Sequence, residues 1–223
     1  IGFFFGPKPF ELSHLPVQED HPKFTTDSYS FSKQITEEVG DYFWRRDGIS
    51  SANLRFGAGW HNPQLTREEE ITAYVAAKER ALYLATLPPE ESAALIAKAQ
   101  TTFDQFRTER AFEGKTSYVK ALADPDLKLM WMKHTFFSYV DLADACQAME
   151  LGLTADYQGS HPLSVVHETN ILNQDAAELA RLFYPNVANE HTWAGAQGFL
   201  SGERASEVIG FKASIHPDQL LQP

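Results

Sequence analysis

The sequence predicts an α/β protein whose strands form a parallel sheet, and two observations carry this prediction. An amphipathic helical pattern at residues 28–46 leads directly into a strand pattern at 49–57. A second strand pattern at 161–171 leads into a helical pattern at 174–184. Helices that alternate with buried strands are typical of parallel sheets. The 223 residues, 43% of them hydrophobic, are enough to build a sizeable core.

The first helix is the most clearly delimited element. Residues 7–28 are rich in Pro, Asp, Ser and His, which predicts a long loop ending at Asp27, a good N-cap. From Ser28 to about Arg46 apolar residues recur at spacings of three and four, and Gly48 ends the helix. These residues could face the sheet or a partner surface, and the sequence does not decide between the two. They are Phe31, Ile35, Val39, Tyr42 and Phe43.

The chain then changes from strand to helix. Residues 49–57, ISSANLRFG, are expected to form a strand that ends in glycine. Residues 66–134 are predicted to be a helical insertion, opened by a capping box of Thr66 and Glu69. One face of its helices is too polar for full burial. The helical stretches are expected at 68–87, 88–112 and about 117–123.

The last third returns to alternating strands and helices. Residues 136–153 are expected to be a short extended piece followed by a helix that Asp141 or a neighbour caps. The strand at 161–171 and the helix at 174–184 follow. The segment SEVIGFKASI is predicted to be a short helix and turn.

Composition excludes several classes of function. The net charge of -11 and the lack of a Lys/Arg cluster argue against nucleic-acid binding. No run of 18 apolar residues predicts a membrane span, and the eight histidines show no zinc-ligand spacing, so we expect neither membrane nor metal. The single cysteine, Cys146, lies in a helical, partly apolar context and is expected to be a buried, inert thiol. A cytoplasmic protein that handles a small molecule or a protein is the expectation.

Tyr29 and Lys33 are the residues that suggest chemistry. Four apart on a helix, they place an ammonium one turn from a phenol, and a nearby cation lowers the pKa of a phenol. Such a tyrosine can exchange a proton while hydride leaves or reaches a neighbouring carbon. Tyr74 and Lys78 repeat the spacing in mid-helix, and the spacing alone favours a surface pair over a catalytic one.

Several segments, in order, resemble extended short-chain dehydrogenases/reductases, especially the NAD-dependent epimerase/dehydratase branch. LPVQEDHPKFTTDSYSFSKQITEEV is similar to the family's segment LP-x-x-E-x-HP…D-x-Y-x-x-SK…E. SSANLRFGAG resembles the strand after the catalytic helix, and FSYVDLADACQAMELGL resembles F-x-x-V-x-D-x-A-x-A. QDAAELARLFYPNV and ASEVIGFKASI resemble the closing helix and ending. The resemblance covers most of the chain outside 66–134.

The resemblance implies a fold, a reaction and a site. The fold would be the C-terminal part of a doubly wound Rossmann-type parallel sheet, with a helical substrate-domain insertion. The reaction would be NAD- or NADP-dependent hydride transfer at a hydroxyl or carbonyl carbon, possibly in a nucleotide sugar. Tyr29 would be the general acid/base, and Lys33 would tune it and bind the nicotinamide ribose. Phe56 and Gly57 would pack near the nicotinamide, and family dimers often pack through the catalytic helix. The chain would divide into 1–60, 61–135 and 136–223.

The chain also departs from the family pattern. No Gly-x-Gly-x-x-Gly or Gly-x-x-Gly-x-x-Gly turn is present to bind the pyrophosphate, and IGFFFG, expected to be a core strand, carries no catalytic hydroxyl. The Asn that often follows the next strand is missing from LRFGAG. We therefore expect the first half of such an enzyme to lie upstream, and this chain alone to bind dinucleotide poorly. Two alternatives stay open: a non-catalytic scaffold that binds a partner through the acidic helical insertion, and an unstable truncated product.

Overall fold

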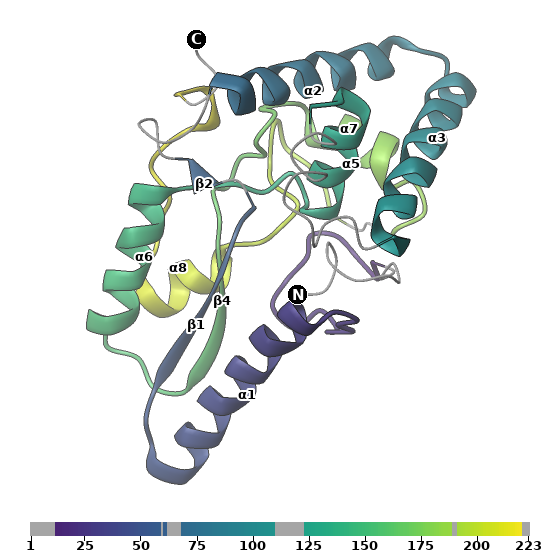
Figure 1. Cartoon of the computed structure of the whole chain (residues 1–223). Coiled ribbons are helices and arrows are strands. Elements are labelled where there is room, and N and C mark those ends of the chain that lie inside the picture. The colour runs from purple at the N-terminus through teal and green to yellow at the C-terminus, as the bar shows by residue number, and fades with distance from the viewer. Residues whose placement is uncertain (1–11, 59, 62–67, 110–122, 189–190, 220–223) are drawn as a thin grey trace.

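The computed structural model describes residues 12–58, 60–61, 68–109, 123–188 and 191–219. Four predictions fall outside these ranges: the opening strand, Thr66 of the capping box, the end of the second insertion helix near residue 112, and almost all of the stretch 117–123. The described residues form the mixed α/β arrangement that the sequence predicts (Figure 1).

Two parallel strands lie at the centre of one half of the molecule. β1 (Ser51–Phe56) pairs with β4 (Ser160–Val165) in register from Ser51 opposite Ser160 to Phe56 opposite Val165. α1 (Ser28–Asp47) contacts both strands, while α6 (Leu142–Thr154) contacts β1 and α8 (Glu203–Ile209) contacts β4 (Figure 1). A shorter parallel pair joins β2 (Trp60–His61) to β3 (Val140–Asp141). The described sheet is thus parallel, as predicted, and it has helices on both faces.

The two faces of β1 differ in chemistry, and this difference explains how the helices pack. Ala52, Leu54 and Phe56 join an apolar cluster with buried residues of α6 and α8. Because successive strand residues point to opposite faces, Ser51, Asn53 and Arg55 face α1 instead. This face is polar and lies close to the helix: a Cβ added to Gly40 would lie 2.6 Å from the Ser51 hydroxyl oxygen.

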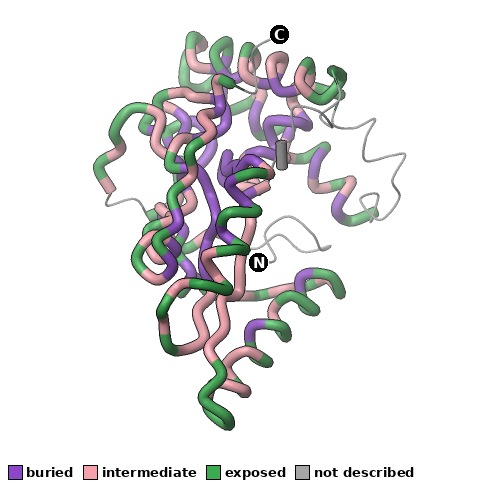
Figure 2. Tube along the Cα trace, turned by 90° about the vertical axis from the view of Figure 1, so that its left-hand side faces the viewer, coloured by how far each residue is buried: buried purple, intermediate pink, exposed green. Residues whose placement is uncertain are grey.

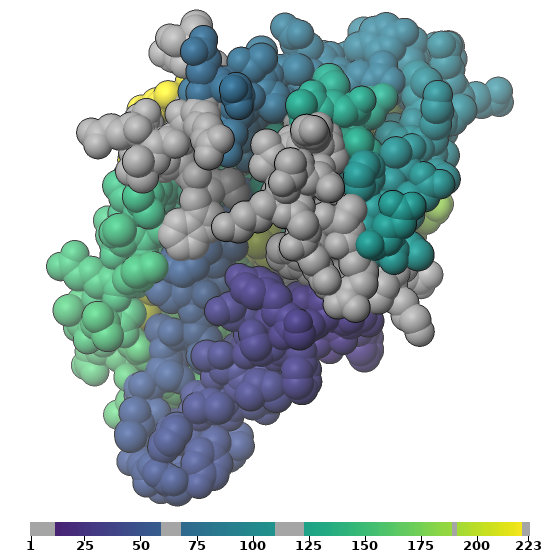
Figure 3. Space-filling model, in the orientation of Figure 1, coloured from purple at the N-terminus to yellow at the C-terminus, as the bar shows by residue number. Residues whose placement is uncertain are grey.

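The polar side of α1 therefore faces the sheet. The buried residues of α1 are Ser30 and Glu37, whereas its predicted apolar stripe points outward. Figure 2 shows α1 as mostly green and pink, and Figure 3 shows it at the lower end of the molecular surface. The sheet-facing alternative for this stripe is thus wrong for at least four of its residues. Their exposed fractions are Phe31 54%, Ile35 44%, Val39 47% and Tyr42 47%.

A second, larger core belongs to the helical body (Figure 1, upper right). Its helices are α2 (Glu68–Thr86), α3 (Pro89–Thr108), α5 (Pro125–His134) and α7 (Ala176–Phe183). α5 packs against α2 and α3, and α7 packs against the same two helices. The predicted insertion therefore shares its core with a helix from the last third of the chain.

α6 corrects one prediction. The helix begins after Asp141, whose carboxylate oxygen accepts a hydrogen bond from the backbone N–H of Ala143, as the sequence predicts. Cys146, however, is exposed and not buried. The helix turns Asp144, Ala145 and Ala148 inward, and Cys146 falls on the opposite side. Among the described helices, none is long and apolar enough to cross a membrane.

Lys128 is a charged residue inside the helical body. It is 5% exposed, and its Nζ lies 3.7 Å from the ring centroid of Tyr74 and 4.6 Å from that of Trp131. Burial lowers the pKa of Lys128 to about 8, and the nearby Glu70 carboxylate only partly opposes this effect. The aromatic rings offer the ammonium group cation–π attraction in place of water.

This lysine predicts a stability that rises with pH. Between pH 8 and the ordinary lysine value of 10.5, folded Lys128 loses its proton while the unfolded chain keeps it. Because the unfolded state then binds more protons, the free energy of unfolding should rise, by about 3 kcal/mol over the window. Urea unfolding at pH 7 to 10 should show this rise as the difference between the wild-type protein and Lys128→Met. Lys98→Met, at an exposed position on α3, should follow the wild type. An identical pH dependence for all three proteins would refute the assignment.

Candidate functional site

A cavity of about 690 Å³ lies where the first turns of α1 meet the carboxyl ends of the parallel strands. Since α1 runs antiparallel to β1, its N-terminal residues lie beside the end of the strand (Figure 1). Tyr29 and Lys33 line the cavity from α1, and Phe56 and Ala58 line it from the end of β1. The carboxyl ends of parallel strands are where open α/β sheets bind ligands.

Three of the four predicted site residues thus share one cavity, and Gly57 has a different position. Gly57 is buried and is not among the residues that line the cavity. A Cβ on it would lie 3.2 Å from the backbone nitrogen of Tyr139 and 3.0 Å from a methyl group of Val166. Glycine at this position therefore permits the close packing of the strand end against the segment before β3.

The Tyr29 and Lys33 side chains lie next to one another, as their spacing predicts. Lys33 Nζ is 5.2 Å from the centroid of the Tyr29 ring, within the range of a cation–π contact. Tyr29 is 58% exposed, so the phenol is accessible to a ligand. Asp27 holds this first turn in place, because its carboxylate accepts a hydrogen bond of 2.7 Å from the Ser30 N–H.

A buried ion network fixes the helix against the strand one turn further on. The Glu37 carboxylate accepts hydrogen bonds from Arg55 Nε at 2.7 Å, from Arg55 Nη2 at 2.9 Å and from Lys23 Nζ at 2.9 Å. Burial alone would raise the pKa of Glu37, but the hydrogen bonds from Arg55 and Lys23 outweigh it, and the net pKa is lowered. Glu37 is therefore ionised at neutral pH and ties α1, β1 and the 12–27 loop together.

The loop before α1 is held to the second strand as well. A Glu19 carboxylate oxygen accepts a hydrogen bond of 2.7 Å from the Ser164 N–H on β4, and Arg55 Nη1 donates to the Glu19 carbonyl. His21, 4% exposed, lines the cavity from this loop. Its Nε2 lies 2.9 Å from the Ser13 Oγ, and burial lowers the pKa of His21. The imidazole is therefore neutral at physiological pH.

The end of α5 and the turn after it also line the cavity. His134, Thr135, Phe136 and Ser138 all line it. Ser138 Oγ donates a hydrogen bond of 2.6 Å to the Thr135 carbonyl and lies 3.3 Å from the Ala58 N–H, which can donate to it. This turn thus connects the helical body to the strand end that carries Phe56.

The same turn has an unusual backbone. Phe136 has φ of 60° and Phe137 has φ of 48°, both in the left-handed region that favours glycine. Two successive non-glycine residues there cost on the order of 1–3 kcal/mol each. Burial of the aromatic rings offsets the cost: Phe137 is fully buried and packs on Phe183 and Phe199. Strain of this kind is concentrated at functional sites.

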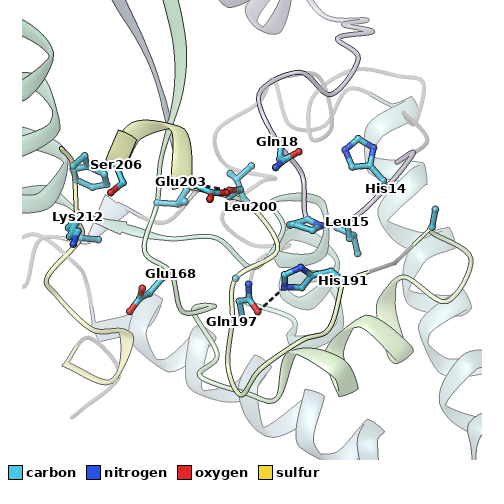
Figure 4. Close-up of a pocket in the computed structure, with 18 residues that line it drawn as sticks. His14, Leu15, Gln18, Glu168, His191, Gln197, Leu200, Glu203, Ser206 and Lys212 are labelled. Atoms are coloured by element: carbon cyan, nitrogen blue, oxygen red, sulfur yellow. Dashed lines mark hydrogen bonds between the residues drawn. The ribbon is translucent and has the colours of Figure 1, made fainter. Parts of the chain in front are cut away.

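A larger cavity of about 1080 Å³ shares Gln18 and Leu200 with the first (Figure 4). Its walls carry charges of both signs, including Glu168, Glu203 and Lys212. His191 Nε2 lies 3.1 Å from Gln197 Oε1, on the side of Figure 4 away from Lys212. None of the four predicted site residues lines this cavity, so the smaller one is the candidate site.

Several site residues were not singled out by the sequence pattern. Glu37 and Arg55 are 18 positions apart, and His134 lies more than 100 positions from Tyr29. Only the folded chain brings them to one cavity, and no spacing rule connects them. Tyr74, by contrast, is 4% exposed and packs beneath Lys128, so the tyrosine of the second Tyr-x-x-x-Lys pair belongs to the helical core. Across the described residues no group of three or more His, Cys, Asp or Glu side chains could hold a metal ion.

Comparison of the chain with protein-family models, with curated proteins and with solved structures found no match.

Proposed function

We propose that this protein is an NAD(P)-dependent oxidoreductase of the epimerase/dehydratase type. The observation that carries the proposal is the position of Tyr29 and Lys33. They lie one helical turn apart and line one cavity at the carboxyl ends of two parallel strands. In this proposal β1 and β4 belong to a larger, doubly wound sheet, whose ligand crevice has the same position.

The cavity suits the nicotinamide end of the cofactor. Its volume of about 690 Å³ is within the range of small-molecule sites, and Phe56 supplies an apolar wall beside polar groups. Lys33 would bind the ribose hydroxyls, and Phe56 would pack near the nicotinamide ring. The cofactor would supply or accept a hydride. For the pyrophosphate the sequence has no Gly-rich turn, so we expect weak binding of the whole dinucleotide by this chain.

Tyr29 would exchange the proton that accompanies hydride transfer. With the Lys33 ammonium beside its ring, Tyr29 would accept the proton of a substrate hydroxyl as hydride leaves the neighbouring carbon. In the reverse direction, the phenol would protonate the oxygen of a carbonyl that is being reduced. A secondary alcohol or ketone, possibly in a nucleotide sugar, is the substrate class that this exchange serves.

Lys33→Met should weaken binding of reduced nicotinamide mononucleotide, which has the nicotinamide ribose but needs no pyrophosphate site. Loss of hydrogen bonds from a charged group should reduce the affinity about tenfold to a hundredfold. Fluorescence titration of the reduced nicotinamide measures this, with Lys98→Met as the control at an exposed position. Equal affinity for both variants would count against a nicotinamide site here.

Hydride transfer itself is the direct test of the function. The purified protein, incubated with NADH or NADPH and a panel of nucleotide-linked keto sugars, should oxidise the nicotinamide slowly, as its absorbance will show. A scaffold that only binds a partner through its helical insertion would show neither turnover nor Lys33-dependent binding.

A further inference from the structure

His134 is a further polar residue of the cavity that Tyr29 and Lys33 line. It ends α5, whereas Tyr29 lies in the first turn of α1. Its ring stacks on Phe103, with centroids 5.0 Å apart and planes inclined by 9°. The stacking leaves the ring little freedom to turn.

Hydrogen bonds determine which ring nitrogen of His134 carries the proton. Lys133 Nζ donates to the Gln100 Oε1 at 2.7 Å, which fixes the orientation of the Gln100 amide. Gln100 Nε2 therefore faces His134 and donates to the Nε2 of the imidazole at 3.1 Å. With Nε2 as an acceptor, a neutral His134 carries its proton on Nδ1.

The surroundings of His134 keep its imidazole neutral and include two positively charged side chains. Burial, and then the Arg107 and Lys133 charges, hold the pKa of His134 well below its ordinary value. A neutral imidazole close to the Arg107 and Lys133 charges is suited to donate to an oxygen that gains negative charge.

We propose that His134 is a further catalytic residue, whose Nδ1–H donates a hydrogen bond to the substrate oxygen during hydride transfer. This rests on the function proposed above and deepens it. In the reductive direction, the carbonyl carbon accepts a hydride from reduced nicotinamide, which is oxidised, and the carbonyl oxygen becomes an alkoxide. His134 stabilises that alkoxide, Tyr29 protonates it to the alcohol, and the Tyr29 phenolate regains a proton from solvent.

The backbone beyond His134 supports this role independently. The two left-handed residues, Phe136 and Phe137, directly follow the turn and line or adjoin the cavity. Phe137 N–H donates to the Met132 carbonyl at 2.7 Å, and Ile171 N–H donates to the Phe137 carbonyl at 2.8 Å. These bonds anchor the strained turn that follows His134 to α5 and to the segment after β4.

Two substitutions separate the catalytic role from a structural one. In His134→Asn, the side-chain amide can place an N–H where Nδ1–H was; in His134→Gln, the amide reaches the position of Nε2 and can still bond to Gln100. The proposal expects kcat for hydride transfer to stay within about tenfold of wild type in the Asn variant. It should fall about 10²–10³-fold in the Gln variant, as when one donor to a developing oxyanion is lost.

A purely structural role, exerted through Gln100, predicts the reverse order and would overturn the proposal, as would equal rates in both variants. Thermal unfolding of both proteins, corrected for their folded fraction, keeps the comparison valid if either is less stable. Tyr29→Phe, assayed alongside, distinguishes failure of the His134 role from failure of the proposed function. If it loses activity while the His134 variants do not differ, only His134 is reassigned. Absence of hydride transfer in the wild type overturns the function and this role together.

Discussion

Replacing Tyr29 with phenylalanine should lower kcat for hydride transfer by about 10²–10⁴-fold, the usual contribution of a general acid/base. The substitution removes one hydroxyl from a residue that is 58% exposed, so the free energy of unfolding should hardly change. The ring remains, and with it the contact to Lys33 Nζ at 5.2 Å. The Kd for reduced nicotinamide mononucleotide should therefore stay within about threefold, a difference of less than 1 kcal/mol. The loss should appear in kcat, measured by single-turnover oxidation of the reduced nicotinamide.

Tyr42→Phe is the matched control. Tyr42 lies on the same helix and is 47% exposed, but it does not line the cavity. Its hydroxyl accepts only a surface hydrogen bond of 3.0 Å from Arg46 among the contacts described. Removal of that hydroxyl should leave kcat unchanged. Equal activity of Tyr29→Phe and Tyr42→Phe would remove Tyr29 from the reaction.

The elements that the sequence predicted correctly are those with local signals. Asp27 caps α1 through the Ser30 N–H, and Gly48 ends it with φ of 69°, as their residue types predict. The strand after α1 was confirmed for the same reason, since its β-forming run is short and is bounded by polar residues and glycine. These signals act over a few residues and need no information from the rest of the chain.

The errors concern contacts between distant elements. α5 was not predicted as a helix because it is buried on several sides, Lys128 included, so it lacks the polar stripe that marks an amphipathic helix. The outward direction of the α1 stripe depends on the polar face that β1 presents, about 20 residues later. The prediction that Cys146 is buried was wrong because the composition of a partly apolar helix does not reveal which of its sides packs against the core.

The candidate site likewise contains residues that a local pattern predicts and residues that only tertiary contacts define. Tyr29 and Lys33 could be predicted because a single helix sets their separation. His134 could not, because three tertiary facts define its proposed role: the cavity it lines, the Gln100 bond that sets its tautomer and the Arg107 and Lys133 charges that lower its pKa. Histidines scattered along a sequence carry no such information.

Glu37→Ala should destabilise the protein by about 3 kcal/mol, since removal of one partner leaves a buried charge uncompensated. Glu37 is 6% exposed, and its carboxylate accepts hydrogen bonds from both Arg55 and Lys23. The side chain of Lys23 is 26% exposed and can turn to water, so the estimate is at the lower end of the range for such losses. Arg55, at 16%, has less freedom and also holds the Glu19 carbonyl. Urea unfolding measures the change. Glu38→Ala, at the exposed neighbouring position, should change the stability by less than about 0.5 kcal/mol.

The pH dependence of the same substitution identifies the cause. The folded-state pKa of Glu37 is lower than its ordinary value of 4.5, so folding favours the ionised form. The stabilisation is therefore fully present above pH 4.5 and is lost as the pH falls through the lower, folded-state value. The difference in unfolding free energy between wild type and Glu37→Ala should be constant from pH 7 to about 5 and should shrink in more acidic solution. A difference that persists unchanged in acid would mean that Glu37 stabilises the helix–strand contact by packing alone. In that case the carboxylate would not be what positions α1, and with it Tyr29 and Lys33, on the sheet.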